Sequence, residues 1–474
     1  MNQAFPRWRL DVAPTFAHCV WLSAPRGGYR RLGAALRRLV ALLCALAAGW
    51  PALAQDSRTV VEPSLPRQAC AVLQAVYGSA KTPEADDTVR LQKALDHCPA
   101  GQAVHLAAAH ERVAFVSGPL TLPSGVTLVV DHGATLYAGT NPRWFDTGTG
   151  QCGRIDNSGK SCKPLITVVD GAQHSAVMGA GTIDGQGGAR IDGQQETWWD
   201  LARRAQAENA HQNVPRLLVS KGARDLTLYR ITLRNSPNFH VLVQQADGFT
   251  AWGVTIDAPA RARNTDGIDP VSSRNVTIAY SWLRTGDDSI AIKAGAAGPT
   301  ENVSVLHNHF YNGHGMSIGS ETYGGVHHVL VQGLTMQGSV SGLRIKSDVS
   351  RGGLVSDVRY QDICLQHVAR PIDFDTHYTA HATGSLIPQY LGVTLQRVYS
   401  LTKGRVQLRG FDAEHALVVR LDDVAVAGDP PLDERAAEFT QLHGVIARAV
   451  PDARKTACEA RLLPFPEPLA PRIP

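Results

Sequence analysis

The chain has 474 residues, of which 44% are apolar and 6% aromatic, and it contains 44 glycines. This composition is typical of a glycine-rich globular protein and excludes an intrinsically disordered chain. The formal net charge of +4 originates in residues 1–54, which carry seven arginines and one aspartate, whereas the 39 basic and 41 acidic residues of the remainder give −2. We therefore expect no nucleic-acid partner, and a charged ligand would need local counter-charges.

The amino terminus has the pattern of a secretion signal. A basic pair, Arg37-Arg38, precedes an apolar run at 39–48, and a small-x-small pattern follows at 52–54. The run is too short to cross a bilayer of roughly 30 Å as a helix. Residues 1–54 are thus predicted to be a signal peptide with a long basic leader, cleaved before Gln55, and the mature protein is expected to be extracellular with no membrane contact.

Six of the eight cysteines follow the predicted cleavage point. An even number in an exported chain favours disulfides, although six cysteines allow fifteen pairing schemes. Sequence proximity favours the following pairs: Cys70 with Cys98, Cys152 with Cys162, and Cys364 with Cys458. None of the six has the close CxxC spacing of a zinc site, so no metal is expected from cysteine.

A helix is predicted after an irregular stretch at 55–82. Asp86-Asp87 can cap its amino terminus. Its apolar positions recur at i, i+3, i+4 and i+7, namely Leu91, Ala94, Leu95 and Cys98. This spacing places them on one helical face. We expect it to be the only substantial helix and to cap one end of the structure that follows.

Short runs of β-forming residues, separated by glycine, asparagine and aspartate, follow the helix. The first are Gln102–Leu106, Val126–Val130, Ala134–Tyr137 and Leu165–Val169. Similar units then begin at Asp225, Gly248, Asn275, Asn302, His328 and Asp357, at intervals of 23, 27, 27, 26 and 29 residues. Each unit continues into a strand of three or four residues and shows no helical pattern.

A period of this length, made of short strands without helix, predicts a solenoid. The units lack the regular leucines and asparagine of a leucine-rich repeat, so a right-handed parallel β-helix fits best. The expected fold is an all-β single domain over 55–474. Its core would span about 102–426, and a tail at 430–474, tied by Cys458, would cover the second open end.

Four charged motifs occur in four successive segments of the chain. They are Asn264-Thr265-Asp266-Gly267, Gly286-Asp287-Asp288, Gly313-His314-Gly315 and Arg344-Ile345-Lys346. Alone, each has an ordinary interpretation: a turn, a solvated turn or calcium ligand, a structural histidine, and a solvated strand face. Together they occupy nearly the same position within successive repeats. In stacked coils, residues at the same position of neighbouring repeats lie roughly 4.8 Å apart. They would line a groove suited to a linear polymer.

The residue types fit the hydrolysis of an acidic polysaccharide. Cleaving a glycosidic bond needs one protonated and one ionised carboxyl group, and three clustered aspartates supply both because their repulsion raises the pKa of at least one. Arg344 and Lys346 are two residues apart on a predicted strand and share one face. Two cations there suit a substrate that carries carboxylates.

These motifs resemble the signature of the polygalacturonases, glycoside hydrolase family 28, and particularly secreted bacterial endopolygalacturonases. Similar segments extend beyond the motifs, over Ser236–His240, Asn264–Pro270, Thr285–Lys293, Gly313–Glu321 and Leu343–Asp348. The resemblance implies a right-handed parallel β-helix and inverting, endo-acting hydrolysis of α-1,4-galacturonosidic bonds in polygalacturonate. It implies no metal and no other cofactor, and we expect a monomer.

The resemblance also implies roles for eight residues: Asp287 as general acid, Asp266 and Asp288 in water activation, His314 beside the acid, Arg344 and Lys346 as carboxylate binders, Asn264 as support for the site, and Tyr378 as a substrate contact. For Tyr378 an ordinary loop aromatic is an equal alternative.

Four other functions stay open. A calcium-dependent pectate lyase on the same fold would use Asp287-Asp288 as calcium ligands. A non-catalytic polysaccharide-binding solenoid would need no acid–base cluster, and rhamnogalacturonan hydrolysis is disfavoured because His314, Arg344 and Lys346 are all present. An exo-acting polygalacturonase would need loops that block one end of the groove. We expect no long insertion beside the motifs, which favours endo action.

Overall fold

The computed structural model describes residues 55–81, 85–428 and 439–466, which lie in one compact unit. The predicted signal peptide at 1–54 lies outside the described residues, as do parts of the predicted tail. The domain boundaries stay predictions. Within the described ranges, no helix is long and apolar enough to cross a membrane.

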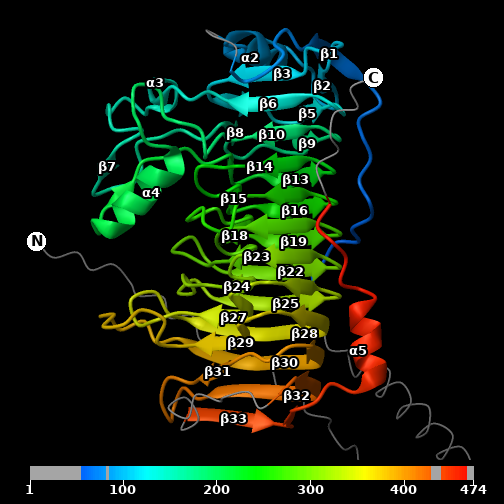
Figure 1. Ribbon diagram of the computed structural model, residues 1–474, viewed down its shortest axis with the longest axis vertical. Coiled ribbons are helices and arrows are strands. Elements are labelled where there is room, and N and C mark those ends of the chain that lie inside the picture. Colours follow the sequence, from blue (N-terminus) through cyan, green and yellow to red (C-terminus); the bar gives the residue numbers. More distant parts are fainter. Residues whose placement is uncertain (1–54, 82–84, 429–438, 467–474) are drawn as a thin grey trace, which may run out of the picture. The chain divides into compact units, whose positions relative to one another are not determined.

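Three parallel ladders of strands form the molecule (Figure 1). The first ladder contains β1 (Ala69–Gln74), β2 (Ala103–Ala107), β5 (Thr127–Val130), β9 (Ala176–Met178), β13 (Arg224–Tyr229), β16 (Asp247–Trp252), β19 (Arg274–Ala279), β22 (Thr300–Leu306), β25 (Val326–Gln332), β28 (Leu354–Gln366), β30 (Gln389–Ser400), β32 (Leu417–Val426) and β33 (Thr440–His443).

The second ladder contains β3 (Ala114–Ser117), β6 (Thr135–Ala138), β10 (Thr182–Asp184), β14 (Thr232–Arg234), β17 (Thr255–Asp257), β20 (Trp282–Thr285), β23 (His309–Asn312), β26 (Thr335–Gln337), the second halves of β28, β30 and β32, and β34 (Ile446–Ala447). The third ladder contains β4 (Leu120–Leu122), β8 (Ile166–Val168), β12 (Leu218–Lys221), β15 (Val241–Gln244), β18 (Ile268–Val271), β21 (Ile290–Ile292), β24 (Met316–Ile318), β27 (Ser341–Lys346), β29 (Arg370–Asp375) and β31 (Val406–Arg409).

The predicted right-handed parallel β-helix is confirmed, since the chain passes through the three ladders in turn and each strand pairs in parallel with its counterpart one coil later. The four strands predicted after the first helix occur as β2, β5, β6 and β8, with ends within one residue of those expected. Only β7 (Ile155–Asp156) and β11 (His211–Gln212), among the named strands, pair antiparallel.

The residue that begins each sequence repeat has a structural role in the first ladder. Asn275 and Asn302 have φ angles of 58° and 57°, and the strand pairing passes over them, from Arg274↔Glu301 directly to Val276↔Val303. Asparagine and aspartate tolerate this left-handed conformation better than most other non-glycine residues. The repeated polar residue is thus a bulge inside the strand.

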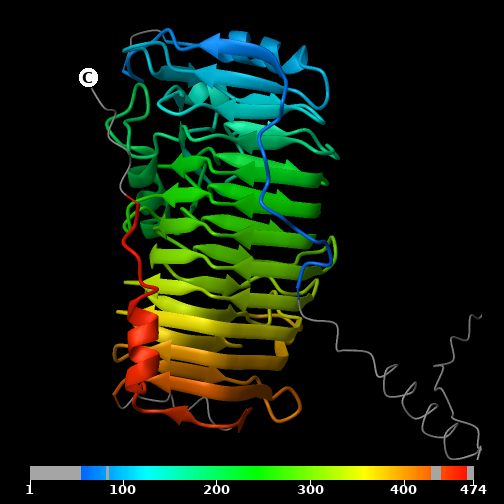
Figure 2. The same ribbon diagram turned by 90° about the vertical axis from the view of Figure 1, so that its right-hand side faces the viewer.

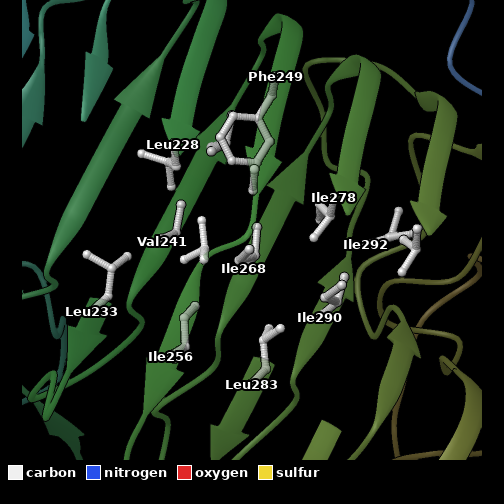
Figure 3. Packing of buried hydrophobic residues seen from close by; sticks show 14 of the residues in the cluster. Leu228, Leu233, Val241, Phe249, Ile256, Ile268, Ile278, Leu283, Ile290 and Ile292 are labelled. Atoms are coloured by element: carbon white, nitrogen blue, oxygen red, sulfur yellow. The ribbon is translucent and has the colours of Figure 1, made fainter. Parts of the chain in front are cut away.

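The inside of the coils is a continuous stack of apolar side chains. Figure 3 shows Leu228, Phe249 and Ile278 of the first ladder facing Val241 and Ile268 of the third. All five are fully buried. Because each coil adds one such layer, apolar burial holds the stack together and the polar residues of the third ladder are left to the outer face.

The predicted helix is α2 (Thr88–Asp96), and it covers the amino-terminal end beside β3 and β4 (Figure 1). Leu91 and Leu95 are buried as expected. Asp87 occupies the cap position without a side-chain cap bond, while Asp86 accepts from the Thr88 backbone N–H at 2.8 Å.

The expectation of a single substantial helix is wrong. Besides the short α3 (Pro142–Phe145), the described residues contain α4 (Trp198–Ala207) and α5 (Asp452–Glu459). A capping box formed by Thr197 and Asp200 begins α4, and its apolar positions Trp198, Leu201 and Ala205 are buried. Both signals are present in the sequence.

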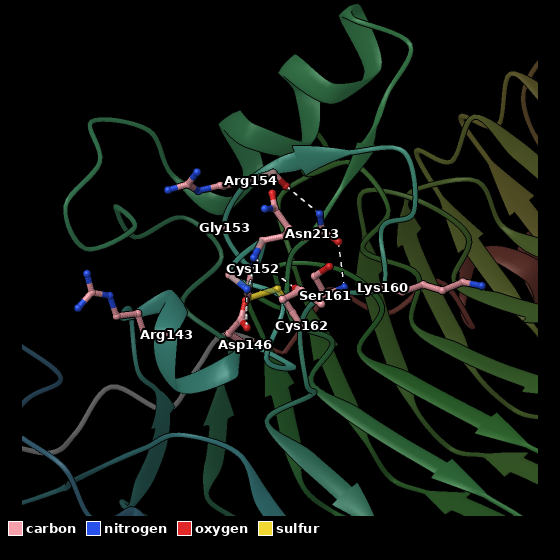
Figure 4. Close-up of a disulfide and its surroundings, with 12 residues drawn as sticks. Arg143, Asp146, Cys152, Gly153, Arg154, Lys160, Ser161, Cys162 and Asn213 are labelled. Atoms are coloured by element: carbon pink, nitrogen blue, oxygen red, sulfur yellow. Dashed lines mark hydrogen bonds between the residues drawn. A yellow bond between two sulfur atoms is a disulfide. The ribbon is translucent and has the colours of Figure 1, made fainter.

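The three disulfides favoured by sequence proximity are present, with Cα–Cα distances of 5.4, 5.0 and 5.5 Å. The Cys152–Cys162 bond closes a loop outside the coils (Figure 4). There Asp146 accepts from the Cys152 N–H at 2.9 Å, and the Asn213 side chain accepts from the Ser161 N–H at 2.9 Å. The first bond lies within the loop, and the second attaches the loop to the segment that precedes β12.

The described part of the carboxyl-terminal tail has two parts, and its role as an end cap stays a prediction. Strands β33 and β34 extend the coils, whereas α5 is tied to β28 by Cys364–Cys458. The chain then follows the flank, where the Leu463 carbonyl accepts from Tyr311 at 2.8 Å. The segment from Asp56 to Glu62 also runs along a flank (Figure 2), with Asp56 accepting from Thr277 at 2.7 Å.

Candidate active site

The third ladder brings three of the predicted site residues to one register. Its pairs run from Ile268 to Ile290, from Ile290 to Met316 and from Met316 to Leu343. Asp266, Asp288 and His314 each precede a member of this series by two residues. They therefore lie on three consecutive coils, as the spacing of the motifs predicted.

Asp287 is the most accessible of the three predicted aspartates, with 18% of its side chain exposed. Its Oδ1 lies 2.9 Å from Nδ1 of His314, and its Oδ2 accepts from the Asn264 amide at 3.4 Å. Because part of the side chain remains exposed beside these two contacts, a ligand on the outer face of the ladder can reach the carboxyl group.

Asp288 is buried, with an exposed fraction of 1%. Lys346 donates to its Oδ2 at 2.7 Å, Ser317 donates to its Oδ1 at 2.6 Å, and Arg344 approaches Oδ1 at 3.5 Å. The Asp288 carboxyl group is thus surrounded by side-chain donors from two neighbouring strands, β24 and β27. The Lys346 contact also joins the predicted hydrolytic residues directly to the predicted carboxylate binders.

Asp266 forms a buried group with two residues that the motif analysis did not assign. Lys293 lies 2.5 Å from Oδ2 of Asp269 and 3.6 Å from Oδ2 of Asp266. Oδ1 of each aspartate is buried without a hydrogen-bond partner. Asp269 was detectable in the sequence, because it is a lone carboxylate within the apolar run of β18.

The environments of these carboxyl groups move their pKa values in opposite directions. Burial, together with the charges of Asp269 and Asp287, raises the pKa of Asp266 well above its ordinary value. Burial likewise raises the pKa of Asp269 to about 6. For Asp287, burial acts upward, but the hydrogen bond and charge of His314 and the charge of Lys346 hold its pKa below the usual range.

This separation gives the cluster a protonated member and an ionised member, as acid–base catalysis requires. In the free protein, however, the direction of the pKa shifts favours the protonated form of Asp266 and the ionised form of Asp287. The general-acid role predicted for Asp287 thus needs a change in its surroundings when substrate binds. The roles of the individual carboxyl groups stay predictions.

The two predicted carboxylate binders lie side by side on β27. Arg344 and Lys346 have exposed fractions of 8% and 6%, and Nε of Arg344 lies 3.4 Å from Asp373. The Tyr378 ring is 5.2 Å from the Arg344 guanidinium carbon and 5.2 Å from the Lys346 nitrogen. Tyr378 is 39% exposed, so the structure brings it to the cations and to solvent together.

Asn264 is held by a segment outside the coils. Its Oδ1 accepts from the Gln212 amide at 3.0 Å, and Oε1 of Gln212 accepts from Arg263 at 2.7 Å. Gln212 ends β11, within the segment that the Cys152–Cys162 loop supports (Figure 4). Sequence reasoning missed Gln212, because nothing in its local pattern places it near Asn264.

This contact corrects the expectation that no long insertion adjoins the motifs. The segments at 139–165 and 185–217 leave the coils between β6 and β8 and between β10 and β12. They form a lobe that contains α3, β7, α4 and β11 (Figure 1). The lobe reaches the site through Gln212.

Asp287, Asp288 and His314 place ligand atoms within 4.8 Å of one another, a spacing that could hold a metal ion. The positive charges around Asp288 disfavour the binding of a metal ion there. The Asp288 oxygens already meet Lys346 and Arg344, so a divalent ion would be placed beside two cations.

The fold and the site together define a class of protein: a parallel β-helix with an acid–base carboxyl cluster and adjacent cations on its third ladder. Comparison with known proteins narrows the class. The family model "Glycosyl hydrolases family 28" matches residues 124–443. The chain belongs to glycosyl hydrolase family 28.

Relatives cover most of the chain. An endo-polygalacturonase of Pectobacterium carotovorum is 47% identical over 379 residues, covering 80% of this chain and 91% of the relative. A polygalacturonase of Ralstonia solanacearum is 40% identical, with coverages of 79% and 81%. The solved structure of a polygalacturonase from Erwinia carotovora is similar at a TM-score of 0.78 and 44% identity, covering 82% of this chain and all of that one.

Proposed function

We propose that the protein is an endo-polygalacturonase, which hydrolyses internal α-1,4-galacturonosidic bonds of polygalacturonate with inversion. The observation that carries the proposal is the direct contact between Asp288, in the carboxyl cluster, and Lys346, beside Arg344. One half of the site is suited to acid–base chemistry and the other to binding the carboxylate of the sugar being cleaved. The similarity to endo-polygalacturonases over 80% of the chain supports the same substrate and the endo mode.

In the proposed mechanism, Asp287 gives its proton to the glycosidic oxygen that leaves. Asp266 and Asp288 hold a water molecule on the other side of the sugar ring, and one of the two, as an ionised carboxylate, accepts its proton as its oxygen bonds to the anomeric carbon. His314 hydrogen-bonds Asp287 and controls its protonation, and Asn264 fixes its second oxygen. No metal takes part in these steps.

Substrate binding would raise the pKa of Asp287, so that its carboxyl group takes up from solvent the proton that the reaction needs. A galacturonate carboxylate bound by Arg344 and Lys346 neutralises part of the positive charge that lowers the pKa of Asp287. The sugar also displaces water from the exposed part of the side chain. Both changes favour the protonated carboxyl group. The substrate carboxylate would thus help to activate the acid that cleaves its own chain.

Two of the alternatives are disfavoured by the same contacts. A calcium-dependent lyase would need Asp287 and Asp288 free for the ion, but Lys346 and Ser317 already donate to Asp288. A non-catalytic binding solenoid has no use for buried carboxyl groups with separated pKa values, which carry a cost in stability.

We further propose that the mature protein is secreted and acts as a monomer on the polysaccharide. The three disulfides fit an oxidising compartment. The predicted signal peptide at 1–54 fits the same route, and amino-terminal sequencing of the secreted protein would test cleavage before Gln55.

Incubation with polygalacturonate, with and without EDTA, tests the function. We expect reducing ends to appear at the same rate in both samples, and early products to be mixed oligomers. Monomer or dimer alone among the early products would contradict endo action. Products that absorb in the ultraviolet, formed only without EDTA, would support the lyase instead.

A further inference from the structure

A pocket of about 450 Å³ lies on the third ladder beside Lys293, over the coils of β12, β15, β18 and β21. Its lining contains the cations Arg216, Lys221 and Lys293 and one carboxylate, Glu321. None of the roles predicted from the motifs falls on these residues. The excess of positive charge suits an anionic ligand.

Two of these cations pack against one aromatic ring, that of Phe239. The Arg216 guanidinium carbon lies 5.3 Å from the centre of the Phe239 ring, and the Lys293 nitrogen lies 4.6 Å from it. The arrangement matches that of Tyr378 with its own arginine and lysine, each at 5.2 Å. The site therefore contains two similar sets, each with one arginine, one lysine and one aromatic ring.

The strand register places the carboxyl cluster between Arg216 with Phe239 on one side and Arg344 with Lys346 on the other, while Lys293 follows β21 on the coil of Asp288 itself. Successive pairs join Leu218 to Val241, Val241 to Ile268 and Ile268 to Ile290. Two positions before these four paired strand residues, the chain carries, in the same order, Arg216, Phe239, Asp266 and Asp288. Arg344 and Lys346 lie on β27, two coils beyond the strand that follows Asp288. A polymer that follows this column would meet Arg216 and Phe239 before the carboxyl groups and Arg344 and Lys346 after them.

Arg216 is prepared for a ligand that is not part of the chain. Its Nε is buried without a hydrogen-bond partner, and burial lowers the pKa of its guanidinium. A buried donor without a partner carries a cost that an incoming carboxylate removes. Lys293 differs, because it already contacts Asp269 and Asp266, so Arg216 supplies most of the free binding capacity.

We propose that Arg216 and Lys293, seated on Phe239, form a second carboxylate subsite. It binds the galacturonate unit on the opposite side of the scissile bond from the unit held by Arg344 and Lys346. The inference rests on the proposed function, since it assumes a polymer with a carboxylate on successive units. A subsite of this kind would make the enzyme select de-esterified units on both sides of the bond that it cleaves.

Arg216→Gln tests the subsite, with Arg216→Lys as the conservative variant. Arg420→Gln is the matched control, because Arg420 is an exposed strand arginine of the first ladder. Each protein is assayed on polygalacturonate over a range of concentrations, and its cleavage positions are mapped on oligogalacturonates of defined length. Thermal unfolding is measured for all of them.

We expect Arg216→Gln to raise KM by roughly tenfold or more, the effect of removing a charge-assisted hydrogen bond, with a much smaller change in kcat. Cleavage of short oligomers should shift to other bonds. Arg216→Lys should raise KM less, and Arg420→Gln should behave as the wild type. Unfolding temperatures should stay close to that of the wild type, because the Arg216 side chain forms no hydrogen bond or ion pair with the described residues and loses only its packing on Phe239.

Three results would overturn the subsite. The first is a wild-type KM and cleavage pattern in Arg216→Gln. The second is an equal fall in kcat and unfolding temperature, which would indicate a structural role. If Arg216→Gln does not fold, Arg216→Lys decides, and an unchanged KM there is the third contrary result. In each case an active wild type leaves the proposed function intact, whereas a wild type inactive on polygalacturonate refutes that function itself.

Discussion

The first and third ladders both carry polar residues at a repeated phase, but they use them differently. In the first ladder, Asn275, Asn302 and His328 have φ angles of 56–58° and lie at or near the surface. In the third ladder, Asp266 and Asp288 are nearly fully buried and contact charged residues. Repetition alone therefore does not distinguish a bulge residue from a site residue. Burial together with charge pairing distinguishes the site residues from the bulge residues.

The difference has a physical basis. A bulge needs only a residue that tolerates a left-handed backbone, so the same few residue types return in coil after coil. A site needs different chemistry in each coil, and the third ladder accordingly presents an aspartate, another aspartate and a histidine at one register. Burying these groups is unfavourable unless function retains them. The predictions below test this contrast, beginning with the largest effect.

Asp287→Asn should lower kcat by roughly 10³-fold or more, because the substituted amide cannot donate the proton that the leaving oxygen needs. Binding of polygalacturonate should persist, and the unfolding temperature should stay near the wild-type value. Asp170→Asn, at an exposed position, is the matched control. Activity within tenfold of the wild type in Asp287→Asn would remove Asp287 from the catalytic group.

The pH dependence of stability should reveal Asp269. Its pKa in the folded protein is raised to about 6, so the folded state holds the proton more tightly than the unfolded state. The free energy of unfolding should therefore fall as the pH rises from about 4 through about 6, with Asp269 contributing about 3 kcal/mol.

Urea unfolding at a series of pH values measures this slope. Asp269→Asn should lose that part of the slope, whatever its effect on overall stability, because the amide does not titrate. Asp170→Asn should keep the wild-type slope. An identical slope in Asp269→Asn and the wild type would show that the buried group with Lys293 does not bind a proton in this range.

Arg344→Gln should reduce kcat/KM by roughly 10- to 100-fold on polygalacturonate, the range expected for a lost charge-assisted contact. The loss should be smaller on methyl-esterified pectin, because its esters offer no carboxylate to the guanidinium. Arg420→Gln again provides the control. Equal losses on both substrates would mean that Arg344 positions Asp288 or Asp373 rather than reading the substrate.

Asn302→Ala should have the smallest effect of the series. At a φ of 57° the alanine side chain costs about 1 kcal/mol of stability, whereas Asn302→Gly should be nearly neutral. Neither should change kcat or KM. Chemical denaturation and initial rates measure both. A loss of activity in Asn302→Gly would contradict the division between the two ladders.

The contrast between the two ladders also explains how much of the fold and of the site could be predicted from the sequence. The fold and the common register of Asp266, Asp288 and His314 were predictable, because strand spacing repeats along the chain. Lys293 follows Ile292, which pairs through Ile318 to Ile345 just before Lys346, so its position could have been inferred from the same repeat.

Other features of the structure could not be predicted from the sequence repeat. The lobe at 139–165 and 185–217 interrupts the coils, and no period relates Gln212 to Asn264. The partnership of Arg216 and Phe239 also depends on side-chain directions that the spacing leaves open. The directions of the pKa shifts follow from burial in three dimensions, which explains why the aspartates were predicted as a cluster but Asp287 was not expected to be the ionised member.

Proton NMR of the first products from polygalacturonate tests the central claim most directly. The account predicts that the newly formed reducing ends appear first as the β anomer and then mutarotate, because one water molecule attacks the α-linked carbon from the opposite side. The α anomer first would mean retention and a covalent intermediate on one of the aspartates. Signals of an unsaturated sugar would contradict hydrolysis altogether.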